Sequence, residues 1–166
     1  HTAYRRQRQM CIRDRYPNRD FLWRISSAQV ELEHSVFTNL PDYHRFLTVL
    51  DGTLALQIGS APRAVLSPWT VCEFDGRTPV ESWEQCTDLN LMLRKGACTG
   101  AMEVLRLSAG QSSLVQPDWD ILGLYCVQGG VSWLKCGQFG LLREATAFHL
   151  DPAEDSVFLA MNIRLL

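Results

Sequence analysis

The stretch Asp88-Leu89-Asn90-Leu91-Met92-Leu93-Arg94 decides the fold class, because apolar and polar residues alternate along it with a period of two. The leucines occupy one face of a strand, and Asp88, Asn90, Met92 and Arg94 occupy the other. Asp and Asn are depleted in strands, so their regular placement needs a reason. If the leucine face packs in a core, the polar face meets either solvent or a pocket.

The same alternation of apolar and polar residues appears along the chain after Asp20. In residues 21–28, Phe21, Trp23 and Ile25 share one face, and Arg24 shares the other with a serine. Further strands are expected at 45–50, 53–58, 71–74, 80–83, 88–93, 102–107, 121–127, 131–134, 145–150 and 157–165. Asp51-Gly52 is predicted to be a hairpin turn. Only residues 30–38 have helical potential, and they have no convincing caps. The pattern predicts an all-β sandwich or barrel.

The length of 166 residues suits one ordinary domain or two small ones packed together. A seam is expected at 96–100, where small residues follow the end of a strand. Each half supplies enough strands for a small barrel. We therefore expect one barrel over 20–96 and a second over 97–166.

Charge is unevenly placed along the chain. Residues 1–20 contain six Arg and two acids, a balance of +4, whereas residues 21–166 contain ten Lys and Arg against sixteen acids, a balance of −6. An acidic body disfavours nucleic-acid binding, which needs clustered Lys and Arg. No apolar run approaches the ~18 residues of a membrane span. Residues 1–19 are expected to be a non-native or disordered start that replaces a first strand.

The sequence lacks the motifs of several common kinds of site. The histidines form no HxH, HxxxH or HExxH pattern and the cysteines no CxxC, so no metal site is predicted. Neither a GxSxG elbow nor a phosphate-binding glycine loop is present, and no cofactor is expected. The six cysteines are widely spaced, which is typical of free thiols in the reducing cytoplasm. We therefore expect a cytoplasmic location.

Arginine on a strand face, with Asn and Trp nearby, suits a receptor for carboxylates, since guanidinium binds a carboxylate through two parallel hydrogen bonds. Arg24, Trp23 and Asn90 are residues of this kind. The alternative is that these positions are simply the exposed side of an antiparallel sheet. The residues by themselves leave both readings open.

Several motifs resemble those of the HutD/Ves family of cupin-fold proteins. Residues 20–26 are similar to its D-F-x-W-R-x-S strand, and 37–45 to its F-S-x-F-P-G-x-x-R segment, with Leu40 for Phe and Asp42 for Gly. Residues 47–52 are similar to its strand ending in L-[ED]-G, and 66–76 to its L-x-P…F-x-G/A-D segment. Residues 88–94 resemble its D-F-N-[LIV]-M-x-R signature. The likeness covers residues 20–96, and the family's opening Trp-Lys/Arg-Asn-Gly/Ala-Gly segment is absent.

The resemblance implies a bicupin, with two cupin-like (RmlC-type) double-stranded β-helix barrels, no two-histidine metal motif and often a homodimer. It implies that Arg45 faces an anionic ligand, with Trp23, Arg24, Asn90 and Met92 as neighbours, and Asp88 joins this predicted site. The expected ligand is a small carboxylate similar to formylglutamate or urocanate. The expected role is regulation or metabolite buffering in histidine utilisation, or in a stress response, rather than catalysis.

Two other functions stay open at this point. One is a metal-free isomerase or hydrolase acting on a small carboxylate, with Asp75 or Asp88 as the base. The other is a structural or protein-interaction role. The sequence identifies neither the ligand nor the oligomeric state.

Overall fold

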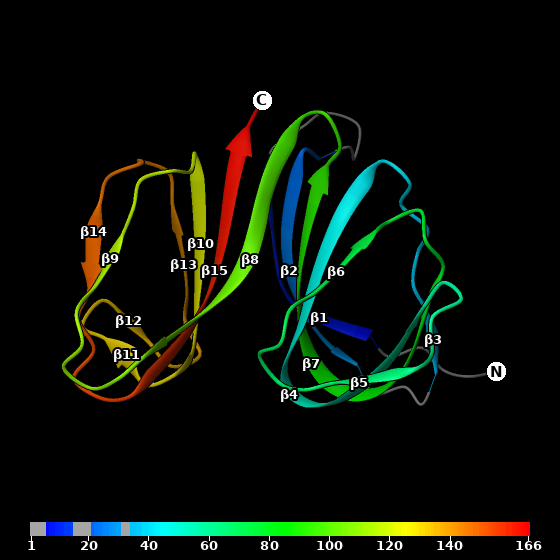
Figure 1. Cartoon of the computed structure of the whole chain (residues 1–166), viewed down its shortest axis with the longest axis horizontal. Helices are drawn as coiled ribbons and strands as arrows, with labels where there is room; N and C mark the ends of the chain where they lie inside the picture. Colours follow the sequence, from blue (N-terminus) through cyan, green and yellow to red (C-terminus); the bar gives the residue numbers. More distant parts are fainter. Residues whose placement is uncertain (1–5, 15–20, 31–33) are drawn as a thin grey trace. The chain divides into compact units, whose positions relative to one another are not determined.

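The computed structural model describes residues 6–14, 21–30 and 34–166, and within these ranges every regular element is a β-strand (Figure 1). None of these segments forms a helix that is long and apolar enough to cross a membrane. The chain divides into two compact units, His1–Cys98 and Thr99–Leu166. The boundary lies inside the small-residue segment 96–100 that the sequence marks as a seam.

The first unit is built on one antiparallel sheet with the strand order β1-β2-β7-β4-β5. Strand β3 pairs with β7 in addition, and β6 pairs with β4. The long strands β4 and β7 curl, so that the sheet wraps around its own interior (Figure 1). The strands are β1 (Arg6–Arg13), β2 (Trp23–Val30), β3 (Ser35–Val36), β4 (Tyr43–Ile58), β5 (Ala64–Leu66), β6 (Cys72–Asp75) and β7 (Val80–Arg94).

Asp51-Gly52 is not a hairpin turn, as predicted, but part of a β-bulge inside the continuous strand β4. The pairing with β7 shifts register between Val49 and Asp51. Gly52 has φ +92°, and a Cβ there would lie 2.2 Å from the carbonyl oxygen of Gln85. A positive φ and a close backbone approach both require glycine, which is why a turn-like pair occurs in mid-strand. The segments 80–83 and 88–93 are likewise one strand, β7.

The bulge also decides which side chains enter the core of the first unit. Before it, the odd-numbered Leu47 and Val49 are buried, and after it the even-numbered Leu54 and Leu56 are buried. A regular strand would send these two pairs to opposite faces, because side chains alternate with a period of two. One extra residue restores a single apolar face, which packs with Phe37, Phe74 and Val80.

The arginine-rich start does not lie outside the fold. Residues 6–13 form β1 and pair antiparallel with β2, with Ile12 opposite Ile25 and Arg13 opposite Arg24. The prediction that 1–19 are disordered is therefore wrong for 6–13, while 1–5 and 15–19 fall outside the described residues. The predicted helical tendency of 30–38 is also wrong where the chain is described. Strand β3 forms there instead, and 31–33 lie outside the described ranges.

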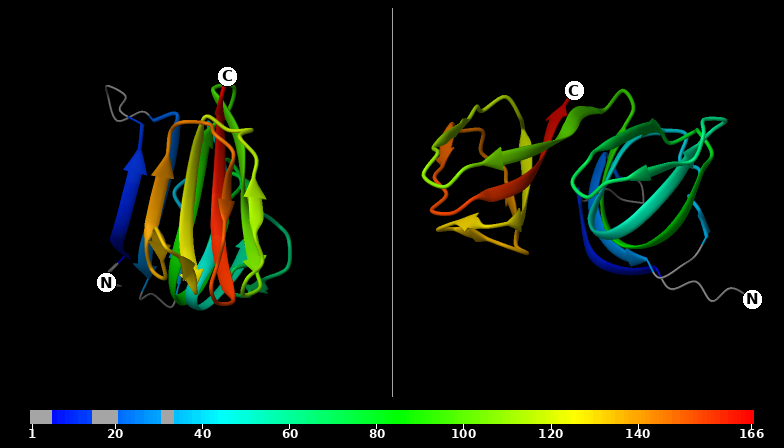
Figure 2. Two further views of the ribbon diagram at one scale, coloured as in Figure 1. Left: turned by 90° about the vertical axis from the view of Figure 1, so that its left-hand side faces the viewer. Right: turned by 60° about the horizontal axis from the view of Figure 1, so that its bottom comes forward.

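The second unit places a four-stranded sheet, in the order β13-β10-β15-β8, opposite the two small pairs β14-β9 and β11-β12 (Figure 2). Its core contains Trp119, Leu124, Leu150 and Phe158. Residues 131–134 belong to a minimal hairpin rather than to the predicted strand. The strands are β8 (Cys98–Leu107), β9 (Ser113–Val115), β10 (Ile121–Gln128), β11 (Gly130–Val131), β12 (Leu134–Lys135), β13 (Phe139–Leu142), β14 (Phe148–Leu150) and β15 (Ser156–Leu165).

Candidate functional site

The register of β2, β7 and β4 brings most of the predicted site residues to one face. Met92 pairs with Arg45 on one side and with Arg24 on the other, and residues directly opposite each other point the same way. Asn90 pairs with Leu47 and Asp88 pairs with Val49. Since Leu47 and Val49 belong to the core, this is the inner face of the first unit. The predicted residues that share it are Arg24, Arg45, Asp88, Asn90 and Met92.

Trp23 does not join this group. It pairs with Leu93, which pairs with His44, so its side chain projects from the opposite face of the sheet. Trp23 is only 1% exposed, so it is a packed residue on that other face. The register therefore contradicts the prediction that Trp23 is a neighbour of Arg45 at the site, because a single step along a strand reverses the direction of a side chain.

Arg45 is held at the centre of the inner face. Its side chain is 2% exposed, and its guanidinium carbon lies 5.2 Å from the ring centres of both Phe37 and Phe74. Nη2 donates to Oδ1 of Asn90 over 3.4 Å, and Nη1 donates to the carbonyl of Thr38 over 3.5 Å. Both distances are at the long end for hydrogen bonds, and a charge-assisted pair normally reaches about 2.7–2.9 Å. The phenylalanines thus supply apolar walls, and these two hydrogen bonds are long.

Asn90 adds a second donor to this place. The residue is 1% exposed, and its Oδ1 is directed at Arg45. Its Nδ2 is buried and has no hydrogen-bond partner among the described residues. A buried amide left without a partner costs about 1–3 kcal/mol. An orphan donor next to a buried guanidinium is the arrangement that an incoming oxygen acceptor would complete.

Two further arginines stand on the same face toward one end of the strands. The Arg24 guanidinium lies 5.4 Å from the ring centre of Phe21, and that of Arg94 lies 5.8 Å from the ring centre of Tyr43. Tyr43 is tied down by its hydroxyl, which donates to the carbonyl of Phe21 over 2.7 Å. Met92 packs with Phe21 and Tyr43. Guanidinium groups from three neighbouring strands thus make this end of the face electropositive.

The two carboxylates that the sequence offered as bases are on different faces. Asp88 points inward, is 1% exposed and accepts a hydrogen bond from the Ala28 amide over 3.1 Å. Asp75 pairs with His44 and so lies on the outer face. The hydrogen bond from Lys95, and then that from the Arg77 amide, hold the pKa of Asp75 below its usual value. A carboxylate engaged in this way is a weak base.

The three histidines of the described segments, His34, His44 and His149, are similarly separate. His44 contacts Glu73, His34 lies 3.6 Å from Glu81, and His149 makes a 3.1 Å hydrogen bond to a serine hydroxyl. In the described parts of the chain, no three His, Cys, Asp or Glu side chains gather in a way that could hold a metal ion.

Sequence reasoning missed the groups that surround Arg45. Phe37 and Phe74 lie within motifs that were recognised, but nothing in a motif shows that Phe74 pairs with Arg45 across β6 and β4. The Thr38 carbonyl could not be found either, because a backbone group carries no signal in the sequence. Strand register is the missing information in both cases.

The sequence model of the HutD family matches residues 7–162. PA5104 from Pseudomonas aeruginosa PAO1, a conserved protein of unknown function, is 22% identical with a TM-score of 0.77, over 98% of this chain and 95% of that one. HutD from Pseudomonas fluorescens SBW25 is 18% identical with a TM-score of 0.76, over 99% and 95%. No curated protein sequence matches significantly.

A more distant likeness identifies the fold. Oxalate decarboxylase of Bacillus subtilis is 7% identical with a TM-score of 0.68, over 99% of this chain and 78% of that one. The described residues form only strands, and this neighbour is a cupin-fold protein, so the architecture is all-β and cupin-like. Since the family match spans nearly the whole chain and includes β1, the chain belongs to the HutD family.

Proposed function

We propose that the inner face of the first unit binds a small carboxylate. The observation that carries this proposal is the unpartnered Nδ2 of Asn90, buried beside the guanidinium of Arg45. In this arrangement one carboxylate oxygen accepts from Arg45 and the other from Asn90. Both new bonds shorten to about 2.7–2.9 Å, and the orphan donor gains a partner.

The surroundings favour an anion over a neutral ligand. Phe37 and Phe74 cover the guanidinium and keep water away from it, and a charge-assisted bond is stronger where the local dielectric is low. Arg24 and Arg94 stand on the same face and add to the positive potential. Asp88 also lies on this face, two residues before Asn90 on β7. One of its carboxylate oxygens accepts a hydrogen bond from the Ala28 amide of the neighbouring strand.

The family connects this site with a metabolic role. Membership of the HutD family supports a function in histidine utilisation, in which binding of a pathway carboxylate would regulate or buffer the pathway. Formylglutamate and urocanate are the ligand types of this role, since both carry a carboxylate on a small body. A binding function requires no base, in keeping with the engagement of Asp75 by Lys95.

The experiment is calorimetric titration of formylglutamate, urocanate and formate into the protein and its variants. Arg45→Met keeps the bulk of the side chain and removes the charge, so affinity should fall about ten- to hundredfold. Asn90→Leu removes the weaker donor and should cost about three- to tenfold. Arg63→Met, an arginine of the same unit that is exposed and stacked on Trp83, should leave affinity unchanged.

Circular dichroism must show that each variant is folded before affinities are compared. Equal affinities in wild type and Arg45→Met, or no saturable binding of any of the carboxylates, would contradict the proposal. Loss of binding in Arg63→Met as large as in Arg45→Met would also contradict it, because the effect would then follow net charge rather than the site.

A further inference from the structure

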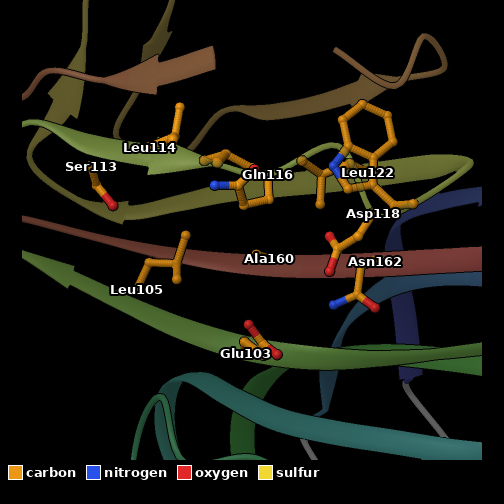
Figure 3. Close-up of a pocket in the computed structure, with 11 residues that line it drawn as sticks. Glu103, Leu105, Ser113, Leu114, Gln116, Asp118, Leu122, Ala160 and Asn162 are labelled. Atoms are coloured by element: carbon orange, nitrogen blue, oxygen red, sulfur yellow. The ribbon is translucent and has the colours of Figure 1, made fainter. Parts of the chain in front are cut away.

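The second unit contains a pocket of about 220 Å³ on the inner side of its four-stranded sheet (Figure 3). One wall consists of side chains from β8, β10 and β15, among them Glu103, Leu105, Leu122 and Asn162. The other wall is the segment from β9 to residue 119. All lining residues come from this unit, so the pocket is separate from the Arg45 site.

Trp119 is the residue that points to a ligand. Its side chain is 4% exposed and packs in the core of the unit, and it lines the pocket. Its Nε1 has no hydrogen-bond partner in the described part of the chain. Buried indole N–H groups usually find an acceptor, and leaving one without a partner is costly. An acceptor atom bound in the pocket would supply what the protein does not.

The charged residues of the lining indicate the charge of the ligand. Glu103 and Asp118 are the charged residues of the lining, which includes no Lys, Arg or His. Asp118 forms a salt bridge with Arg164 over 3.3 Å, whereas Glu103 has no ion pair or hydrogen bond within the described residues. Figure 3 shows the Glu103 side chain on β8 at one side of the pocket, opposite the segment that carries Gln116. The acidic side thus remains available to a cation.

Apolar side chains occupy the space between these polar groups. Leu105, Leu122 and Ala160 lie on the sheet side (Figure 3), and Val115 of β9 lines the pocket from the opposite side. A volume of about 220 Å³ is below the usual ~300–1,000 Å³ of drug-sized sites, which restricts the ligand to a small molecule. The lining therefore combines a carboxylate, an apolar middle and a buried N–H donor.

We propose that this pocket binds a small organic cation whose apolar body carries a hydrogen-bond acceptor, as in an arylethylamine. The ammonium group pairs with Glu103, the ring packs against the leucines, and the acceptor takes the hydrogen bond of Trp119. This pocket is acidic, whereas the Arg45 site of the first unit is basic, and the two proposals rest on different residues.

Tyramine is the probe, because it has an ammonium group, an aromatic ring and a phenolic oxygen that accepts a hydrogen bond. Titration into the full chain, followed by calorimetry and tryptophan fluorescence, should show saturable binding that weakens as salt is raised. Glu103→Gln should weaken binding about three- to fivefold, because Glu103 is exposed, and Trp119→Phe, which keeps a ring but removes the N–H, about three- to tenfold. Hydroxyphenylacetate, which replaces the ammonium by a carboxylate, should not bind at this pocket.

Glu144→Gln is the matched control, since it removes one exposed acid of the same unit that does not line the pocket. It should bind tyramine as wild type does, and so should Arg45→Met. The proposal is overturned if tyramine gives no saturable binding, if Glu144→Gln loses as much affinity as Glu103→Gln, or if hydroxyphenylacetate competes equally. If Trp119→Phe does not fold, Glu103→Gln together with the salt dependence still decides the question.

Discussion

The two units are both built from antiparallel strands around an interior, yet they fill that interior with different chemistry. In the first, the central strands β4 and β7 bring Arg45 and Asn90 into the core. In the second, the central strands β10 and β15 bring Leu124 opposite Ala160 and Cys126 opposite Phe158, all four of them core residues. Polar groups in the second unit stand instead around a pocket with an acidic side.

This difference separates inner positions that serve binding, in the first unit, from inner positions that serve packing, in the second. Burying a guanidinium and an incompletely paired amide lowers stability compared with an apolar core, so such residues point to a function. The second unit has a predominantly apolar core and places its carboxylates where they remain hydrated. The first unit should therefore tolerate apolar replacement of its polar residues, while the second should be sensitive to loss of its apolar ones.

The largest expected effect is on the core of the second unit. Phe158 is fully buried, and Phe158→Ala should lower the free energy of unfolding by about 3–5 kcal/mol through lost burial and the cavity left behind. Urea denaturation measures the loss. Leu114→Ala, a change at a side chain 48% exposed, should cost less than about 1 kcal/mol. Similar losses in both variants would mean that this interior is not tightly packed.

The bulge of the first unit comes next. Gly52→Ala should cost at least about 2 kcal/mol, because it adds left-handed strain and places a Cβ against the Gln85 carbonyl. Gly110→Ala in the second unit, at φ +76° with no atom within 4 Å, should cost only the strain, about 1 kcal/mol. Denaturation of both variants tests this order. An equal cost would show that β4 can shift to accommodate the methyl group.

A smaller effect concerns alkaline pH, where burial raises the pKa values of Cys98 in the first unit and Cys126 in the second by the most among the thiols. Burial, with a lesser contribution from Asp14, raises the pKa of Cys98 from 9.0 to about 11, and burial likewise raises that of Cys126 to about 11, with help from Cys136. The unfolded chain loses these protons near pH 9, whereas the folded chain keeps them until about pH 11. Stability is thus fully present below about pH 9 and falls as pH rises toward 11.

Thermal melts between about pH 8 and pH 10.5 measure this decline, which is expected from the linkage of the two thiols to folding. The double variant Cys98→Ala, Cys126→Ala should show a shallower decline than wild type, although its starting stability is lower. A decline as steep as that of wild type would assign the effect to other groups.

The smallest effect is expected at Asn90 without ligand. Asn90→Leu removes an unpartnered buried donor but also the acceptor that Arg45 contacts over 3.4 Å, so the two effects oppose each other and the free energy of unfolding should change by less than about 1 kcal/mol. Melts with and without formate complete the test, since formate should stabilise wild type more than the variant. A large loss in the ligand-free variant would show that Asn90 is structural.

Much of the fold could be read from alternation alone. The period of two in 88–94 and 21–28 predicts strands β7 and β2, and both form. The predicted hairpin turn at Asp51-Gly52 was wrong because the same dipeptide suits a tight turn and a bulge. Only the pairing with the partner strand distinguishes the two. The predicted disorder at the start of the chain was wrong for 6–13 because the many arginines gave no strand pattern, although this segment pairs with β2.

The candidate site was predictable to a lesser extent. The resemblance supplied Arg45, and alternation placed Asp88, Asn90 and Met92 on one face of β7. The resemblance also implied Trp23 as a neighbour of Arg45, and the register of β2 places it on the opposite face. The pocket lined by Glu103 and Trp119 has no sequence pattern, since it joins residues from separate strands and loops.

The sequence by itself determined most of the long strands, their apolar alternation and the resemblance to the family, because these depend on neighbours along the chain. Only the tertiary structure decided which polar side chains meet: Arg45 with Asn90 and two phenylalanines, and Glu103 with Trp119 around a pocket. The physical reason is that strand register and bulges are set by the packing of the whole sheet. A shift of one residue sends a side chain to the opposite face, and no local pattern specifies that shift.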